Sequence, residues 1–378
     1  MWYMNEEREM LKNMMSEFVA NEVKPLVKDM ENDIYPKEVF KKLGDLGFGG
    51  LCQEEKYGGM GVDWINFGIA LEEIAKESNT LALLTSLNYD FTINAIKELC
   101  TPEQVERFIK PAIRGDIILG YWTTEPVGVF NMPEYETRAE KDGDEWVING
   151  GKIFATNAGI ADYAFISAKT SDFDPSTMQG LSWFLIPKDA EGFQVGRPEH
   201  KLGWKGTETC QVYFDNVRLS DEYRVGPVGG IAPTMINNLS EGYSLYGVMT
   251  LGSATSVWER TRKFLSERIQ NGKSLWDAHQ VVRNDMAKMW IEIENFRHSV
   301  YSVLENRTRG ENVIMDSIAL KVQGCKLLES VASQCIVLHG GTGSVIETDI
   351  ERFYRDAKMC YLGCGSNNIL TDFLTKYL

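Results

Sequence analysis

The sequence predicts an α+β protein with an N-terminal α-helical domain, a central β-rich domain and a C-terminal four-helix domain. Apolar residues recur at spacings of three and four up to about residue 117, and again from about residue 231 to the end, which is the helical period. Between these segments, short β-rich runs alternate with turn sequences and no helical pattern intervenes, which favours an antiparallel sheet or barrel. The expected domains are therefore residues 1–117, 118–230 and 231–378. The length of 378 residues suits two or three domains or one composite unit.

The N-terminal segment has several helix signals. Residues 10–19 carry apolar side chains on one helical face, and helices are also expected over 64–77 and 80–98. The sequence Thr-Pro-Glu-Gln at Thr101 has the form of a capping box, with Pro102 at the first helical position. Another helix is therefore expected to begin next to Thr101.

The central and C-terminal segments differ in period. The β-rich runs are IILGYWTT, EWVING, YAFISAK, SWFLIPK and QVYFDNVRL, and residues 172–180 between two of them are expected to form an exposed loop. The helical period then returns over 233–272, 277–307, 313–338 and 348–360. Four long apolar-striped helices joined by short polar loops are typical of a helix bundle.

Composition excludes several classes of protein. The 39 Lys and Arg against 54 Asp and Glu give a net charge of −15, which argues against a nucleic-acid-binding face or an anionic-membrane partner. The seven cysteines are odd in number and lack a CxxC pair, and the four histidines lack an HExxH pair, so no disulfide framework or metal site is expected. The N-terminus is not a signal peptide, and no run approaches the ~20 apolar residues of a membrane span. We therefore expect a soluble, cytoplasmic protein.

Six segments in this order resemble the acyl-CoA dehydrogenase family of flavoproteins, and the resemblance covers nearly the whole chain. The segments are GYWTTEP (120–126), INGGKIFATNAG (148–159), KLGWKGTETCQVYFDNV (201–217), ERIQNGKSL (267–275), HGGTG (339–343) and ERFYRDAK (351–358). The resemblance implies a helical, β-barrel and four-helix architecture. It also implies FAD between the β and C-terminal domains, completed by a neighbouring subunit of a homo-oligomer, usually a tetramer and sometimes a dimer. An acyl-CoA substrate and an electron-transfer flavoprotein as electron acceptor are implied as well.

The resemblance assigns cofactor contacts to two groups of residues. Aromatic rings and hydroxyls for the flavin come from Tyr121, Thr123, Thr124, Phe154 and Thr156. Arg268 would reach the FAD pyrophosphate of a partner subunit, and Gly340 and Gly341 would let backbone approach the cofactor closely. Each has a plainer interpretation: Thr and aromatic residues favour strands, Arg268 is a solvated cation, and the glycines form an ordinary turn.

The chain departs from the family at the catalytic base, which takes a proton from the carbon next to the thioester carbonyl. Cys364 stands where the family's usual Glu stands, and Gly365 continues the motif. Some members carry the base on the first long C-terminal helix, where this chain has Gly242 followed by Tyr243. Glu241 is adjacent to that position but points elsewhere on a helix, so it is a weak substitute. A thiol is a poor base unless it is activated, so Cys364 is interpreted as a small residue that opens space.

Asp90 is the candidate for a displaced base. It lies in a mostly apolar run, LLTSLNYDFTINAI, in the helix pair that lines the acyl end of the pocket in this family. Burial would raise its basicity, whereas an N-cap or a hydrogen bond from Tyr89 or Asn88 would make it structural. The resemblance extends to the branch that oxidises alicyclic thioesters, in which the usual Glu is missing and an Asp serves. A cyclic enoyl-CoA such as cyclohex-1-ene-1-carboxyl-CoA, oxidised by 1,4-elimination, is therefore the expected substrate.

Two further departures affect the pocket. Phe130 stands where the family has a Ser near the flavin and thioester, and Asn271 replaces a Phe in the Arg268 motif. The residues expected to line the substrate pocket are Leu87, Phe130, Glu241, Gly242, Tyr243 and Gly365.

Two alternatives remain open at this point. One is a dehydrogenase of a thioester bound to a carrier protein. The other is a catalytically silent flavoprotein relative, which the loss of both base positions favours and the retained FAD motifs disfavour. The acyl group and the direction of the reaction in the cell are also open.

Overall fold

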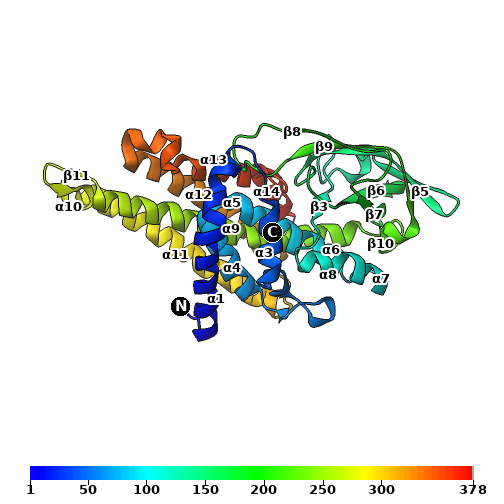
Figure 1. The fold of residues 1–378 in the computed structure, drawn as a ribbon, viewed down its shortest axis with the longest axis horizontal. Helices are drawn as coiled ribbons and strands as arrows, with labels where there is room; N and C mark the ends of the chain where they lie inside the picture. The colour runs from blue at the N-terminus through cyan, green and yellow to red at the C-terminus, as the bar shows by residue number, and fades with distance from the viewer. Residues whose placement is uncertain (377–378) are drawn as a thin grey trace.

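The computed structural model describes residues 1–376, and its elements follow the order helices, sheet, helices along the chain. The early helices pack across a set of long C-terminal helices, and the sheet lies at one end of the molecule (Figure 1). The predicted fold class is therefore confirmed. No helix within residues 1–376 has both the length and the apolar character that a membrane crossing requires.

The N-terminal part consists of short helices around a buried apolar core. Its elements are α1 (Glu6–Phe18), α2 (Val27–Glu31), α3 (Lys37–Asp45), β1 (Cys52–Gln53), β2 (Gly61–Val62), α4 (Trp64–Glu77), α5 (Asn79–Ser86), α6 (Ile93–Ile96), α7 (Pro102–Gln104) and α8 (Lys110–Ile113). The predicted capping box begins α7: the Thr101 hydroxyl accepts from the Gln104 backbone N–H, and the Gln104 side chain accepts from the Thr101 N–H. A π-helical turn, Leu87–Thr92, separates α5 from α6 and contains Asp90. Such turns are frequent at functional sites.

The middle part is one eight-stranded sheet. Its strands are β3 (Leu119–Trp122), β4 (Arg138–Asp142), β5 (Glu145–Ala155), β6 (Tyr163–Asp174), β7 (Gln179–Pro187), β8 (Phe193–Pro198), β9 (Cys210–Ser220) and β10 (Arg224–Val225). The strand order is β10-β7-β6-β4-β5-β9-β8, and β3 pairs with β6. Pairing is antiparallel as predicted, except that β3 lies parallel to β6 and β4 meets β6 at one parallel pair. The predicted exposed loop over 172–180 is the end of the β6–β7 hairpin.

Strands β6 and β7 are buried on both faces. Trp183 and Leu185 on β7 pack into the core shared with the helices. Phe184 and Ile186, which alternate with them, pack into a second core inside the sheet domain. Successive side chains of a strand point to opposite faces, so this hairpin forms the wall between the two cores.

The C-terminal part is built on three long helices that pack side by side. Its elements are α9 (Ala232–Glu267), β11 (Ile269–Gln270), β12 (Lys273–Ser274), α10 (Leu275–Ala278), α11 (Gln280–Thr308), α12 (Ile314–His339), α13 (Glu351–Leu362) and α14 (Asn367–Thr375). The predicted helix over 233–272 is too long at its end. Asn271 and Gly272 have φ of 51° and 76°, the left-handed pair that closes the β11–β12 hairpin.

Trp204, in the loop between β8 and β9, joins all three parts. Its backbone N–H donates to Asp356 Oδ1 on α13 at 2.8 Å, and its indole Nε1 donates to Asn79 Oδ1 on α5 at 2.8 Å. Asp356 is buried, its Oδ2 has no hydrogen-bond partner within residues 1–376, and Arg352 Nη1 lies 3.9 Å away. Burial therefore raises the pKa of Asp356 from 3.8 to about 6, against the lowering effects of Arg352 and the Trp204 N–H.

This raised pKa predicts how stability depends on pH. Asp356 binds its proton more tightly in the folded state, so its contribution to stability is full below about pH 4 and is lost as the pH rises through about 6. Asp356→Asn keeps an acceptor for the Trp204 N–H but cannot ionise. We expect the variant to gain about 1 to 3 kcal/mol in free energy of unfolding relative to wild type between about pH 4 and pH 7, measured by urea denaturation.

The matched control is Asp372→Asn, which removes an exposed carboxyl on α14. Its free energy of unfolding should follow the wild-type dependence on pH. If the Asp356→Asn curve also runs parallel to wild type, the buried carboxyl does not destabilise the fold when ionised.

Candidate active site

The predicted flavin contacts of the sheet domain lie side by side. Tyr121 is on β3, Thr123 and Thr124 follow it, and Phe154 and Thr156 lie at the end of β5. Two hydrogen bonds join these segments: Trp122 Nε1 donates to the Thr156 carbonyl at 2.7 Å, and the Ile153 N–H donates to the Thr124 carbonyl at 2.9 Å. The sheet therefore brings these residues together.

Phe154 and Tyr121 have features that fit a flat ligand with polar edges. The Phe154 side chain is 64% exposed although it is aromatic, and its backbone has a φ of 52°. A bulky residue rarely adopts this left-handed conformation, which often marks a functional position. The Tyr121 hydroxyl is buried and has no hydrogen-bond partner within residues 1–376. The exposed Phe154 ring and the unpaired Tyr121 hydroxyl, on these two adjoining segments, fit a flat ligand with a polar edge.

The other predicted FAD contacts lie at the opposite end of the molecule. Arg268 is exposed after the end of α9, next to the β11–β12 hairpin, which protrudes far from the sheet (Figure 1). Phe264 near the end of α9 stacks on His339 at the end of α12, with ring centroids 4.2 Å apart. Gly340 has a φ of 60°, and a Cβ at Gly340 or at Gly341 would meet no atom within 4 Å. One chain therefore does not bring Arg268 and these glycines to Phe154.

The loop after α13 holds Cys364 in an unusual conformation. Cys364 and Gly365 have φ of 51° and 91°, and both of their carbonyls are bonded by buried side chains. The Tyr243 hydroxyl donates to the Cys364 carbonyl at 2.6 Å, and Lys321 Nζ on α12 donates to the Gly365 carbonyl. Burial raises the pKa of the Cys364 thiol above its usual value, although Tyr246 and Lys321 oppose the shift. This side chain is therefore a thiol at neutral pH.

Aromatic rings pack on both glycines of the predicted pocket. A Cβ on Gly365 would lie 3.0 Å from the Phe130 ring, and a Cβ on Gly242 would lie 2.6 Å from the Phe91 ring. The second contact is closer than real Cβ atoms approach, so a carboxylate side chain at 242 would require Phe91 to move. The chain therefore lacks an acid at this position and also lacks the space for one.

Asp90 is fully buried and forms an ion pair. Its Oδ1 accepts from Arg307 Nη2 at 2.7 Å and from Asn94 Nδ2 at 2.7 Å, and Arg307 Nη1 lies 3.4 Å from Oδ2. Neither partner suggested by the sequence, Tyr89 or Asn88, hydrogen-bonds to Asp90 within residues 1–376. The Tyr89 hydroxyl donates to the Phe40 carbonyl. The Asn88 side-chain oxygen accepts from the Leu119 N–H, and its Nδ2 has no hydrogen-bond partner in the described residues.

Glu241 belongs to the same group of charges. Its half-buried side chain has a raised pKa, chiefly because of burial; the Asp90 carboxylate raises it further and Arg307 lowers it. Arg307 also donates to the Ser244 hydroxyl at 3.1 Å and lies 3.5 Å over the Trp64 ring. Leu87 is buried one turn before Asp90. Arg307 therefore forms an ion pair with Asp90 and acts electrostatically on Glu241. No local sequence pattern indicates this role of Arg307.

An apolar cavity of about 320 Å³ leads to Phe130. It lies between the Phe130 loop, the β6–β7 hairpin, the start of α9 and α14. Its lining includes Met178, Ile236 and Ile369, with Lys376 also present. Phe130 therefore separates this cavity from Gly365 and Cys364.

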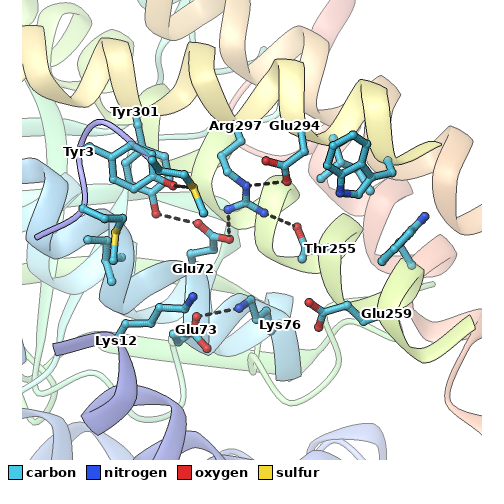
Figure 2. Close-up of a pocket in the computed structure, with 16 residues that line it drawn as sticks. Tyr3, Lys12, Glu72, Glu73, Lys76, Thr255, Glu259, Glu294, Arg297 and Tyr301 are labelled. Atoms are coloured by element: carbon cyan, nitrogen blue, oxygen red, sulfur yellow. Dashed lines mark hydrogen bonds and ion pairs between the residues drawn. The ribbon is translucent and has the colours of Figure 1, made fainter. Parts of the chain in front are cut away.

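A second cavity of about 200 Å³ lies between α4, α9, α11 and the N-terminal segment, and charged side chains form part of its wall (Figure 2). Figure 2 shows Glu72 at its wall, where it accepts from Arg297 at 2.5 Å and from the Tyr301 hydroxyl at 2.7 Å. Tyr3 stacks on Tyr301 with ring centroids 3.7 Å apart. These paired groups anchor the N-terminal segment on the helices, away from the residues predicted for the site.

A buried ion pair holds the segment that carries Phe130. Lys152 Nζ lies 2.6 Å from Glu125 Oε1, and their side chains are 0% and 1% exposed. Glu125 also accepts from the backbone N–H of Glu136 at 2.5 Å and from that of Thr137. Burial lowers the pKa of Lys152 to about 8, although Glu125 opposes the shift. No local sequence pattern indicates this pair, although Glu125 lies within GYWTTEP and Lys152 within INGGKIFATNAG.

Comparisons with known proteins find one family along nearly the whole chain. Family models for the N-terminal, middle and C-terminal domains of acyl-CoA dehydrogenase match residues 5–116, 120–217 and 232–378. A short-chain specific acyl-CoA dehydrogenase of Clostridium acetobutylicum is 32% identical over 96% of this chain and 95% of that protein. A 3-(aryl)acrylate reductase of Clostridium sporogenes is 26% identical, over 97% of each. The butyryl-CoA dehydrogenase structure of Megasphaera elsdenii has a TM-score of 0.93 at 27% identity and covers 99% of this chain and 98% of that one.

The ion pair of the Phe130 segment can be tested directly. Lys152→Met leaves the buried Glu125 carboxylate without its cation, so we expect a loss of about 3 to 5 kcal/mol in free energy of unfolding. Lys141→Met, which removes an exposed lysine on β4, is the control and should cost less than about 1 kcal/mol. A small effect of Lys152→Met in urea denaturation would mean that Glu125 is held by the backbone donors alone.

Proposed function

Because this chain belongs to the acyl-CoA dehydrogenase family, we propose that it dehydrogenates a cyclic acyl-CoA thioester, with Asp90 as the catalytic base. The observation that carries the proposal is the position of the acids. The two usual base positions hold Cys364 and Gly242, whereas Asp90 is buried in the π-helical turn next to Glu241. The family activity, acyl-CoA dehydrogenation with FAD, is shared by this protein; the cyclic substrate and the base are the proposal.

FAD fits the residues of the sheet domain. The Phe154 ring would cover the flavin, and Tyr121, Thr124 and Thr156 would offer hydroxyls to its polar edge. When bound, FAD supplies the acceptor for the hydride that leaves the substrate. Arg268 and the Gly340–Gly341 turn lie too far away in the same chain, which supports a homo-oligomer, with a tetramer proposed, in which a neighbour completes each FAD site (Figure 1).

The cavity next to Phe130 suits the pantetheine arm of CoA, because its lining is mostly apolar and Phe130 in its wall packs on Gly365, the residue after Cys364. The thioester would then lie at the loop after α13, and the acyl group would extend toward Phe91 and Asp90. Phe130, which packs on Gly365, must turn aside to admit the thioester.

Asp90 would contact the acyl group at a carbon further from the thioester carbonyl than the α-carbon. Protons at that distance are acidic only when a double bond conjugates them to the thioester, as in a cyclic enoyl-CoA. Arg307 and Asn94 orient the Asp90 carboxylate, and they also compete with the substrate proton for it. Glu241 has no cation at bonding distance within residues 1–376 and a raised pKa, so it is the second candidate for the proton. Electrons would leave to an electron-transfer flavoprotein.

Phe154 provides a test of the cofactor site. Phe154→Ala removes an exposed ring and no packed core, so we expect a folded protein whose dissociation constant for FAD rises about tenfold or more, measured by flavin fluorescence. Tyr213→Ala, which removes another exposed aromatic ring of the sheet domain, is the control and should bind FAD as wild type does. Equal FAD affinity in Phe154→Ala and wild type would contradict the assignment.

Anaerobic titration tests the substrate and the base together. Cyclohex-1-ene-1-carboxyl-CoA should bleach the flavin band of the FAD-loaded protein, and a straight-chain acyl-CoA should not. Asp90→Asn should slow bleaching by about a hundredfold or more and leave FAD bound. Glu241→Gln is the matched variant of the neighbouring acid and should bleach at nearly the wild-type rate.

The other outcomes select other functions. If Glu241→Gln is slow and Asp90→Asn is fast, Glu241 is the base. If the straight-chain thioester or only a carrier-protein thioester bleaches the flavin, the cyclic substrate is wrong. If no thioester reduces the bound flavin, the chain is a catalytically silent relative.

A further inference from the structure

The Phe130 ring closes the cavity of about 320 Å³ against the loop after α13. It lines that cavity, and a Cβ on Gly365 would lie 3.0 Å from its Cε2 and 3.5 Å from its Cζ. Carbon atoms in ordinary contact are about 3.5 to 4.0 Å apart, so a methyl group does not fit between the loop and the ring unless the ring moves. Phe130 therefore stands between the places proposed for the pantetheine arm and for the thioester.

The backbone that carries Phe130 is held on both sides of this residue. The Tyr135 hydroxyl donates to the Val129 carbonyl at 2.6 Å, and the buried pair of Glu125 and Lys152 holds the segment before it. The Lys152 ammonium lies 4.7 Å from the centroid of the Tyr135 ring, so the two anchors belong to one buried group. The Phe130 side chain is only half-buried. It can therefore rotate while its backbone stays in place.

The opposite wall is the backbone of the loop after α13, and buried side chains hold it as well. The Tyr243 hydroxyl donates to the Cys364 carbonyl at 2.6 Å, and the buried Lys321 donates to the Gly365 carbonyl. Gly365 has a φ of 91°, which favours glycine, so this wall carries no side chain at its closest point. The width of the space between the two backbones is therefore set by the Phe130 ring.

We propose that Phe130 makes the site selective for thioesters with a planar α-carbon, the carbon next to the carbonyl, as in an α,β-unsaturated or aromatic acyl group. When the ring leaves Gly365, a planar conjugated group can stack against it. A tetrahedral α-carbon carries substituents on both sides of any plane through it, so it needs a wider opening. The resemblance places a Ser at this position, and a Ser would leave the space open.

The inference rests on the proposed function, in which a cyclic enoyl thioester lies at the loop after α13, and it names a residue that selects such a substrate. Selection against a competing ligand can come from a steric clash as well as from attraction to the preferred one. Phe130 supplies the clash, because the ring must move further for a tetrahedral carbon. This selection concerns shape and does not depend on which acid removes the proton.

Two unreactive thioesters measure the selection as binding alone. Benzoyl-CoA has a planar α-carbon and pivaloyl-CoA a tetrahedral one, and neither carries a hydrogen on that carbon. Their dissociation constants are measured by titration calorimetry on the FAD-loaded protein. We expect the wild-type protein to bind benzoyl-CoA at least about tenfold more tightly than pivaloyl-CoA. Phe130→Ala should reduce this ratio at least about fivefold, chiefly through tighter binding of pivaloyl-CoA.

Three further variants complete the test. Phe173→Ala is the matched control, because it removes another ring from the wall of the same cavity. It should weaken the binding of both thioesters by a similar factor and leave their ratio at the wild-type value. Phe130→Tyr keeps an aromatic ring and should also keep the wild-type ratio. Phe130→Ser restores the side chain that the resemblance places here, and it should lower the ratio as Phe130→Ala does.

The possible results are distinct. A wild-type ratio in Phe130→Ala and Phe130→Ser, or a wild-type protein that binds the two thioesters equally, overturns the inference. Failure of both thioesters to bind to the wild-type protein and to these variants overturns the proposed function and the inference with it. Reduction of the flavin by a straight-chain thioester overturns the cyclic substrate alone, because the ratio is measured with ligands that lack a hydrogen on the α-carbon.

Discussion

The contacts of Trp204 with Asn79 and Asp356 set the frame on which the site depends. One residue of the sheet domain bonds to a helix of the N-terminal part and to a helix of the C-terminal part, and its ring also limits the loop after α13. A Cβ on Gly363 would lie 2.5 Å from that ring, so only glycine fits there. The position of Cys364, one residue later, is therefore fixed by an interaction between domains. A buried acid with a raised pKa is tolerated because it orients this tryptophan.

The chemistry of the site follows from where charge is allowed in a buried space. The chain keeps the aromatic and hydroxyl residues quoted for a flavin, and Arg307 pairs with Asp90 near Glu241. The loop after α13 carries the Cys364 thiol, and its carbonyls accept from Tyr243 on α9 and Lys321 on α12. The Asp90–Arg307 ion pair and the Lys321 ammonium are both buried, so each of these charges is held by hydrogen bonds within the chain.

Local sequence patterns predict most of the helices and strands, but they do not predict contacts between residues that are far apart in the chain. The helical period located α9, α11 and α12, and the capping box located the start of α7. The helical period predicts an α9 that runs to residue 272, whereas the helix ends at Glu267. Asn271 and Gly272 form a hairpin turn, and they lie within the Arg268 motif that the resemblance assigns to cofactor binding. The sheet-domain residues quoted for the flavin lie together, because hydrogen bonds to the Thr124 and Thr156 carbonyls join the segment after β3 to the end of β5. The apolar run around Asp90 marks it as an unusual acid, and the structure shows it buried, yet its partner Arg307 is 217 residues away and nothing in the local pattern connects the two.

The β6–β7 hairpin, with apolar side chains on both faces, has a consequence for how the chain folds. When one face of a strand is polar, its pairing register is well determined, because a shift by one residue would expose its apolar side chains. Here Trp183 and Phe184 are both buried, so the pattern of the hairpin cannot distinguish one alignment from the next. Correct pairing must be selected by the shapes of two cores that close on it from opposite sides. We therefore expect the sheet domain not to fold independently of the helices. An isolated fragment of it would expose the apolar face that carries Trp183 and would be prone to aggregate.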